Sequence, residues 1–271
     1  MTARTSSRTS FAGQASKALT VTLFAALFLG LLAKQASAGD LDQVSAIHKK
    51  SDFGFSVLRE GDAIGNHSID FTRRGEDLVV DVSIDLEVKF AFITVYRYTH
   101  RNQEIWRDGQ LYSIKTKTDD DGTEHWVKGR ASAEGFVVES DSGNAVLPSD
   151  VIPSSYWHPD TPKAETLLNT QTGELAQINV AAAASKSYVP MPWGQEAARS
   201  FEISGDVDLN LWYDDKGCLL KMNFAAPGDG SQIDYVPARH PVSASGPSLA
   251  GYPLIGDCVR LEMTSIGPAQ H

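Results

Sequence analysis

The stretch from Asp77 to Thr118, DLVVDVSIDLEVKFAFITVYRYTHRNQEIWRDGQLYSIKTKT, decides the fold. Over its first twelve residues, every second side chain is apolar and the side chains between them are polar apart from Val79. The apolar set is Leu78, Val80, Val82, Ile84, Leu86 and Val88. Because successive side chains of a strand point to opposite faces, the alternation predicts a strand with one buried and one wet face. At about 3.3 Å per residue it spans about 40 Å, about twice a typical strand, which favours a curved sheet or barrel.

Similar patterns surround this stretch. Turn signals such as Asp108-Gly109 separate alternating segments, and a second alternating run predicts one strand from Phe201 to Tyr213. Four prolines between Ser142 and Pro162 predict a long crossing loop, and residues 163–169 suggest a short helix. The predicted fold is mainly β: a single curved antiparallel sheet forming a half-barrel or open barrel, with a long crossing loop and little helix.

The N-terminus has the pattern of an export signal. Basic residues precede an apolar run from Ala18 to Ala33, and Ala36-Ser37-Ala38 has the small residues of a cleavage site. We therefore expect residues 1–38 to be a cleaved signal peptide, 39–237 an antiparallel β domain, and 238–271 a Pro/Gly/Ser-rich tail. The predicted location is periplasmic or secreted; a retained N-terminal anchor is the alternative.

The charge balance narrows the expected partners. The chain has 24 basic and 34 acidic residues, a net charge of −10. Removing the four basic residues of 1–38 leaves 20 basic against 34 acidic residues, a net charge of −14. This disfavours nucleic acid and anionic lipid headgroups, but it allows a small apolar or cationic ligand. No later apolar run reaches about 18 residues, so the mature chain is not expected to be an integral membrane protein.

Familiar catalytic motifs are missing from the sequence. It contains no Gly-x-Ser-x-Gly, phosphate loop, dinucleotide fingerprint or HExxH, so neither a cofactor nor a metal is predicted. Cys218 and Cys258 could form one disulfide in an oxidising compartment, or they could be two separately buried thiols.

Two aromatic clusters remain as candidate sites. Residues 154–160, SSYWHPD, lie in the predicted crossing loop, and residues 211–214 read LWYD. Each cluster could line a ligand pocket or pack against the sheet as an anchor. With aromatic residues of the long hairpin they give the candidate ligand-binding set Tyr96, Tyr98, Trp106, Tyr156, Trp157, His158, Trp212 and Tyr213.

These clusters also carry a resemblance. The segments are Tyr98-x-His100 with Glu104-x-Trp106-x-x-Gly109-x-Leu111, Ser155-Tyr156-Trp157, Leu168 to Gly173, Gly205 with Asn210 to Asp214, and Ile233-x-Tyr235. Together they cover about Phe53 to Pro237 and resemble a bacterial exported family of unknown function, domain-of-unknown-function family 6134. The family's pattern is similar to that of periplasmic half-barrels of the lipoprotein-carrier type, which implies a curved sheet around an apolar cavity. The resemblance to this family implies no catalytic residues.

Three functional hypotheses follow. The first is a non-catalytic periplasmic protein that binds an apolar or amphipathic ligand such as a lipid. The second is an envelope assembly or interaction protein with another envelope protein as its partner. The third is a hydrolase that uses the Trp157-His158-Asp160 loop.

Overall fold

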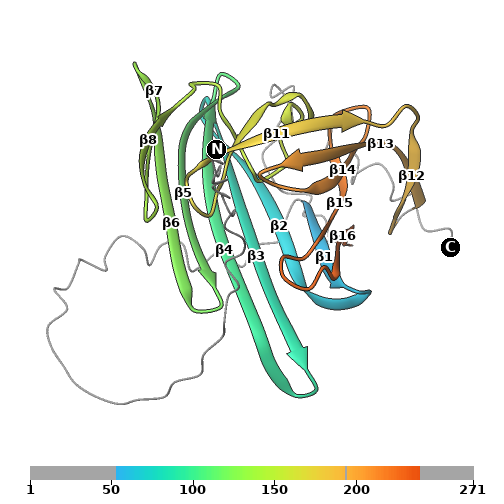
Figure 1. Cartoon of the computed structure of the whole chain (residues 1–271). Coiled ribbons are helices and arrows are strands. Elements are labelled where there is room, and N and C mark those ends of the chain that lie inside the picture. Colours follow the sequence, from blue (N-terminus) through green and yellow to red (C-terminus); the bar gives the residue numbers. More distant parts are fainter. Residues whose placement is uncertain (1–52, 193, 239–271) are drawn as a thin grey trace, which may run out of the picture. The chain divides into compact units, whose positions relative to one another are not determined.

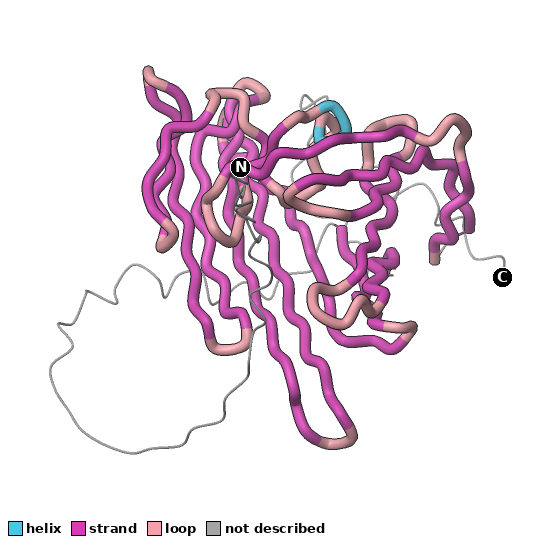
Figure 2. Tube along the Cα trace, viewed as in Figure 1, coloured by secondary structure: helices cyan, strands magenta, loops and turns pink. Residues whose placement is uncertain are grey.

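The computed structural model describes residues 53–192 and 194–238, most of which lie in β-strands (Figure 1). The predicted signal peptide, most of the predicted tail and Cys258 lie outside the described residues. A 3-10 turn, Thr161–Lys163, is the helical segment within the described ranges (Figure 2). Within the described residues, no helical segment has both the length and the hydrophobicity that a membrane-spanning helix needs.

The first half of the described chain is an antiparallel meander, which agrees with the predicted antiparallel sheet. Each strand pairs with the next along the chain, in the order β1 (Phe53–Arg59), β2 (Asp62–Arg74), β3 (Asp77–Phe90), β4 (Ile93–Arg107), β5 (Gln110–Asp120), β6 (Thr123–Ser132), β7 (Gly135–Ser140) and β8 (Gly143–Leu147). The alternating stretch is therefore a strand, β3, and it is 14 residues long.

The second half continues the same sheet from the other side of β1. Its strands are β9 (Ile152–Pro153), β10 (Thr166–Leu168), β11 (Leu175–Ala182), β12 (Ser187–Met191), β13 (Gly194–Gly205), β14 (Leu209–Tyr213), β15 (Leu219–Ala225) and β16 (Gln232–Pro237). The last strand, β16, pairs with β1. The sixteen strands within residues 53–192 and 194–238 form one sheet that is antiparallel except between β9 and β10, and among these residues the sheet is not closed. The predicted fold class is confirmed.

The sheet curls so that its far end returns to its concave face. Trp157, just after β9, packs edge-on against Phe71 of β2 and Trp106 of β4. Gln171, just after β10, accepts a hydrogen bond from the Tyr98 hydroxyl on β4. The segment 154–172 therefore covers the interior of the curled sheet.

The β3–β4 hairpin extends beyond its neighbours (Figure 1). Its end carries exposed apolar side chains: Phe90, Phe92, Ile93 and Val95 are 76%, 100%, 69% and 53% exposed. The opposite ends of the same strands are buried, because Leu78 and Val80 belong to the main core. One strand pair thus reaches from the core to a solvent-exposed apolar tip, residues 90–95.

Three local predictions were wrong. Residues 163–169 form the end of the 3-10 turn and β10 instead of a helix. Residues 143–147, assigned to the crossing loop because of their composition, pair with β7 as the edge strand β8. The run from Phe201 to Tyr213 is two strands, because the chain reverses after Gly205. Gly205 has a φ of 130°, and a Cβ there would lie 2.5 Å from the Gln177 carbonyl oxygen.

Candidate functional site

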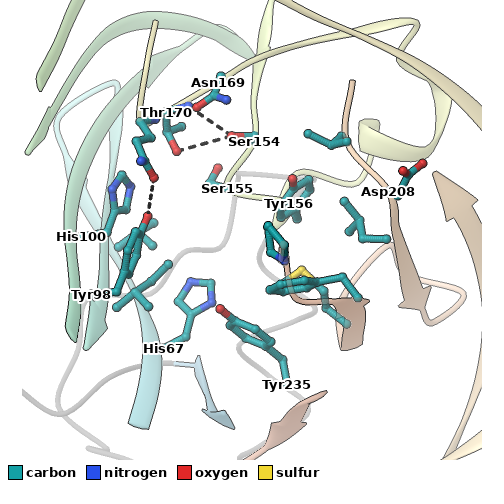
Figure 3. A pocket seen from close by; sticks show the side chains of 18 of the residues that line it. His67, Tyr98, His100, Ser154, Ser155, Tyr156, Asn169, Thr170, Asp208 and Tyr235 are labelled. Atoms are coloured by element: carbon teal, nitrogen blue, oxygen red, sulfur yellow. Dashed lines mark hydrogen bonds between the residues drawn. The ribbon is translucent and has the colours of Figure 1, made fainter. Parts of the chain in front are cut away.

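A cavity of about 560 Å³ lies between the two halves of the sheet (Figure 3). Apolar side chains from both halves line it: Val82 and Ile84 of β3, Leu209 of β14, Met222 and Phe224 of β15, with Val207, Ala225 and Pro227. Tyr98, Tyr156 and Tyr235 add aromatic surface. The alternation of β3 therefore places its middle apolar residues at a cavity, while Val80 is fully buried in the core.

One wall of the cavity is polar. It is formed by the covering segment and contains Ser154, Ser155, Asn169, Thr170 and Gln171. Hydrogen bonds hold this wall together, since the Thr170 backbone N–H donates to Ser154 Oγ at 3.1 Å. Tyr98 ties the wall to β4 by donating its hydroxyl to Gln171 Oε1 at 3.1 Å.

Two histidines lie on the sheet side of the cavity. The strand register places Phe55, His67, Ile84, His100 and Thr118 opposite one another on five neighbouring strands. His100 is 3% exposed, and its Nδ1 lies 2.8 Å from Thr118 Oγ1. Burial lowers the pKa of His100 to about 4, helped by the nearby Arg101 guanidinium.

His67 differs from His100 in having no hydrogen-bond partner for either ring nitrogen among the described residues. The side chain is 3% exposed and packs between the rings of Phe55 and Tyr235, at centroid distances of 5.7 and 5.6 Å. Burial, together with the proximity of His100, lowers its pKa to about 3. His67 is therefore a neutral imidazole at the cavity with unused hydrogen-bonding capacity.

The charged side chains of the lining are two carboxylates, Asp206 and Asp208, in the turn between β13 and β14. Both are exposed, and hydrogen bonds fix each of them in the turn. Asp206 Oδ2 accepts the Gln177 backbone N–H at 2.7 Å, and Asp208 Oδ1 accepts the Gly205 backbone N–H. The lining contains no lysine or arginine among the described residues.

Two of the eight predicted ligand-binding residues, Tyr98 and Tyr156, line the cavity. Tyr156 has a φ of 60°, a left-handed conformation that is uncommon outside glycine. Its carbonyl oxygen accepts the hydroxyl hydrogen bond of Tyr213, which is 3% exposed. Tyr213 therefore does not line the cavity itself but holds the residue that does.

Trp106, Trp157 and His158 form a separate buried cluster around Glu104, which is 0% exposed. Both indole N–H groups donate to Glu104 Oε2 at 2.9 Å, and Asn102 Nδ2 donates to Oε1 at 2.8 Å. Burial raises the pKa of the Glu104 carboxyl, and these donors oppose that rise. The cluster anchors the covering segment to β4.

His158 belongs to this anchor. Its ring stacks on Trp106 at 4.7 Å, and its Nδ1 accepts the backbone N–H of Asp160 at 3.2 Å. The Asp160 carboxylate instead accepts a hydrogen bond from Lys163 Nζ. Burial lowers the pKa of His158 to about 4. The side chain is 4% exposed and is not part of the cavity lining, so the geometry gives no support to a His158–Asp160 catalytic pair.

The remaining candidates lie outside the cavity lining. Tyr96 donates its hydroxyl to Asp120 Oδ1 at 2.7 Å, nearer the hairpin tip. Trp212 packs on a small second core of Val189, Met191, Ala198, Cys218 and Leu220, with Lys221 Nζ 5.1 Å from its ring centre. Cys218 is 5% exposed, and its proposed disulfide with Cys258 stays a prediction.

Sequence reasoning missed His67 and His100 as lining residues. His67 falls on an alternating strand with Ile69 and Phe71 on the same parity, which is a signal of burial. The signal does not say that the residue meets a cavity, because that depends on the cross-strand register. Within the described ranges, no group of three His, Cys, Asp or Glu side chains could hold a metal ion.

Comparison with known proteins gives a family and a structural likeness. A search of curated proteins finds no match. Among solved structures, the chain is similar to a beta-barrel-like protein of domain of unknown function DUF1849 from Brucella abortus, with a TM-score of 0.47 and 11% identity, covering 70% of this chain and 96% of that one. The family model described as Domain of unknown function (DUF6134) matches residues 55–238. The chain therefore belongs to the DUF6134 family.

Proposed function

We propose that this protein is exported and binds an apolar or amphipathic small ligand, such as a lipid, without catalysing a reaction. The observation that supports it is the cavity, about 560 Å³ in volume and lined mainly by apolar and aromatic side chains of both sheet halves. Cavities of about 300–1,000 Å³ with this kind of lining are typical of small-molecule sites. Burying a hydrocarbon chain there removes apolar area from water on both partners.

Native mass spectrometry with lipid extraction of freshly purified protein tests the proposal. We expect a co-purified ligand, or uptake of an added one, that is lost when the cavity is filled. Ile84→Trp places an indole in the lining, and Val146→Trp makes the same kind of change on β8, where Val146 is 55% exposed. Repeatedly empty wild-type protein that takes up no lipid probe, or equal binding by the two variants, would contradict the proposal.

A second candidate is interaction with another envelope protein. The exposed apolar tip at residues 90–95 supports it, since apolar groups exposed to water favour association. Crosslinking from a photoreactive residue at position 92 would test this candidate. A single specific partner, lost when Phe90 and Phe92 are both changed to Ser, would favour it over ligand binding.

A further inference from the structure

The strongest unexplained feature of the cavity is the unpartnered imidazole of His67. A buried polar group without a hydrogen bond is unfavourable, and buried polar groups in folded proteins are nearly always paired. His67 is 3% exposed, lies in the cavity lining, and has no partner for either ring nitrogen among the described residues (Figure 3). It is the group that a ligand's polar end would meet on the sheet side.

The neighbours of His67 fix what that polar end can be. A neutral imidazole offers one N–H donor and one nitrogen acceptor, so a hydroxyl, which is both donor and acceptor, complements it in either tautomer. The ring is held between Phe55 and Tyr235 and across from Ile84, so its position is set by packing on both sides. The apolar surface of Met222, Phe224 and Leu209 remains for a hydrocarbon chain.

The charges of the cavity lining disfavour a ligand with an anionic head group. The described lining has no lysine or arginine, and its charged groups are the carboxylates of Asp206 and Asp208. The nearby guanidinium of Arg101 is used elsewhere, because it donates to Asp85 at 2.6 Å and to backbone carbonyls. A carboxylate or phosphate entering this cavity would lose hydration without meeting a cation, which is strongly unfavourable.

We propose, on the basis of the ligand-binding function above, that the cavity selects amphiphiles with a neutral hydrogen-bonding head group, such as an alcohol, ester or amide, seated at His67, and that it rejects anionic amphiphiles. The site would thus recognise a neutral lipid or lipid-like alcohol rather than a fatty-acid anion or a phospholipid phosphate.

Three amphiphiles with the same ten-carbon chain test this on the full exported protein: 1-decanol, decanoate and decyltrimethylammonium. Titration calorimetry at about pH 7.5, where His67 is neutral, compares head groups at a constant tail. We expect decanoate to bind at least about tenfold more weakly than decanol. Decyltrimethylammonium should bind no more tightly than decanol, since attraction to exposed carboxylates is modest.

Variants of His67 test whether the head group of the ligand binds at this residue. His67→Leu removes both nitrogens and should weaken decanol binding about fivefold to tenfold, the value of one hydrogen bond, while leaving binding of decane unchanged. His67→Gln keeps a donor and an acceptor and should recover most of the loss. His125→Leu is the control and should leave decanol binding unchanged, because His125 lies on β6, pairs with Asp141, and belongs neither to the cavity lining nor to the cluster around Glu104.

The outcomes separate the two proposals. Uptake of decanoate as tight as that of decanol, or equal decanol affinity in wild type and His67→Leu, overturns the head-group inference and leaves ligand binding standing. No uptake of the three amphiphiles or of decane overturns ligand binding itself. If His67→Leu fails to fold, the comparison of the three probes on wild-type protein still decides whether anions are rejected.

Discussion

His67 and His100 lie in one cross-strand row on the concave face of the sheet, with Ile84 of the strand between them. Both are 3% exposed, yet one has a hydrogen-bond partner in Thr118 and the other has none among the described residues. Protonation of either ring is unfavourable, because each imidazolium would be buried and the two positive charges would repel one another.

This row makes stability fall on the acid side. Burial lowers the pKa of His67 from 6.5 to about 3 and that of His100 to about 4. Below pH 6.5 the folded chain therefore binds fewer protons than the unfolded chain. The contribution of the two neutral histidines to the unfolding free energy is fully present above pH 6.5, and it is lost as the pH falls toward the pKa values of the folded state. Each histidine should cost about 1.4 kcal/mol per pH unit in that window. Urea titrations between about pH 6.5 and 5 give the change of unfolding free energy with pH. This change should be smaller in His67→Gln than in wild type, by the contribution of one histidine. Identical pH dependence of the two proteins would contradict the assignment.

Glu104 has the opposite pH dependence. Its carboxyl accepts three side-chain donors in a fully buried site, and burial raises its pKa. Glu104→Gln turns one acceptor oxygen into a donor facing other donors, so we expect a loss of about 1–3 kcal/mol in unfolding free energy. A raised pKa means that the protonated carboxyl stabilises the folded state relative to the unfolded state. The difference in unfolding free energy between wild type and Glu104→Gln should therefore shrink as the pH rises above 4.5.

A control for Glu104 comes from its donors. Trp157→Phe keeps most of the aromatic packing against Phe71 and Trp106 but removes one indole N–H. It should be less damaging than Glu104→Gln, because the carboxylate keeps Trp106 and Asn102. Equal stability of Glu104→Gln and wild type across the pH range would rule out the buried carboxyl as an anchor.

The hairpin tip should contribute nothing to folding. Phe92 is 100% exposed, so Phe92→Ser should change the unfolding free energy by no more than about 0.5 kcal/mol. Phe55, 1% exposed and packed on Phe53, His67 and Tyr235, is the contrasting site, and Phe55→Ala should cost about 3–5 kcal/mol. Thermal denaturation of the two variants side by side measures the difference; a large destabilisation by Phe92→Ser would mean that the tip is packed in solution.

The two cysteines give a chemical prediction. We expect Cys218 and Cys258 to be bonded, so unfolded but unreduced protein should take up no alkylating reagent, and reduction should release two thiols per chain. Reduction should also lower the stability by about 2–4 kcal/mol, as for disulfides closing loops of this kind. Two alkylated thiols without reductant would contradict the bond.

Much of the fold could be predicted from the sequence, because the alternation of apolar and polar side chains is a local property. The parity of Val82 and Ile84 already placed them on the concave face, and the structure places both at the cavity. The same logic failed at Gly205, where the parity continued smoothly through a chain reversal. Alternation reports which face a residue lies on and not whether the strand continues.

The site was less predictable because it depends on long-range register. Tyr156 and Trp157 are adjacent in the chain, yet one ring lines the cavity and the other donates to Glu104 on β4. His67 and His100 become neighbours in a row only through the pairing of β2, β3 and β4. No local pattern contains that information, because it arises when distant segments meet.

The pairing of β1 with β16 has a consequence for how the protein reaches its folded state. Phe55 lies opposite Pro237, so the seam at the middle of the sheet joins the first and the last described strands. Contacts of such high sequence separation form late and slowly. Since Ile84 comes from one side of this seam and Met222 from the other, a chain emerging N-terminus first can assemble its meander early but has no cavity until its last strand arrives.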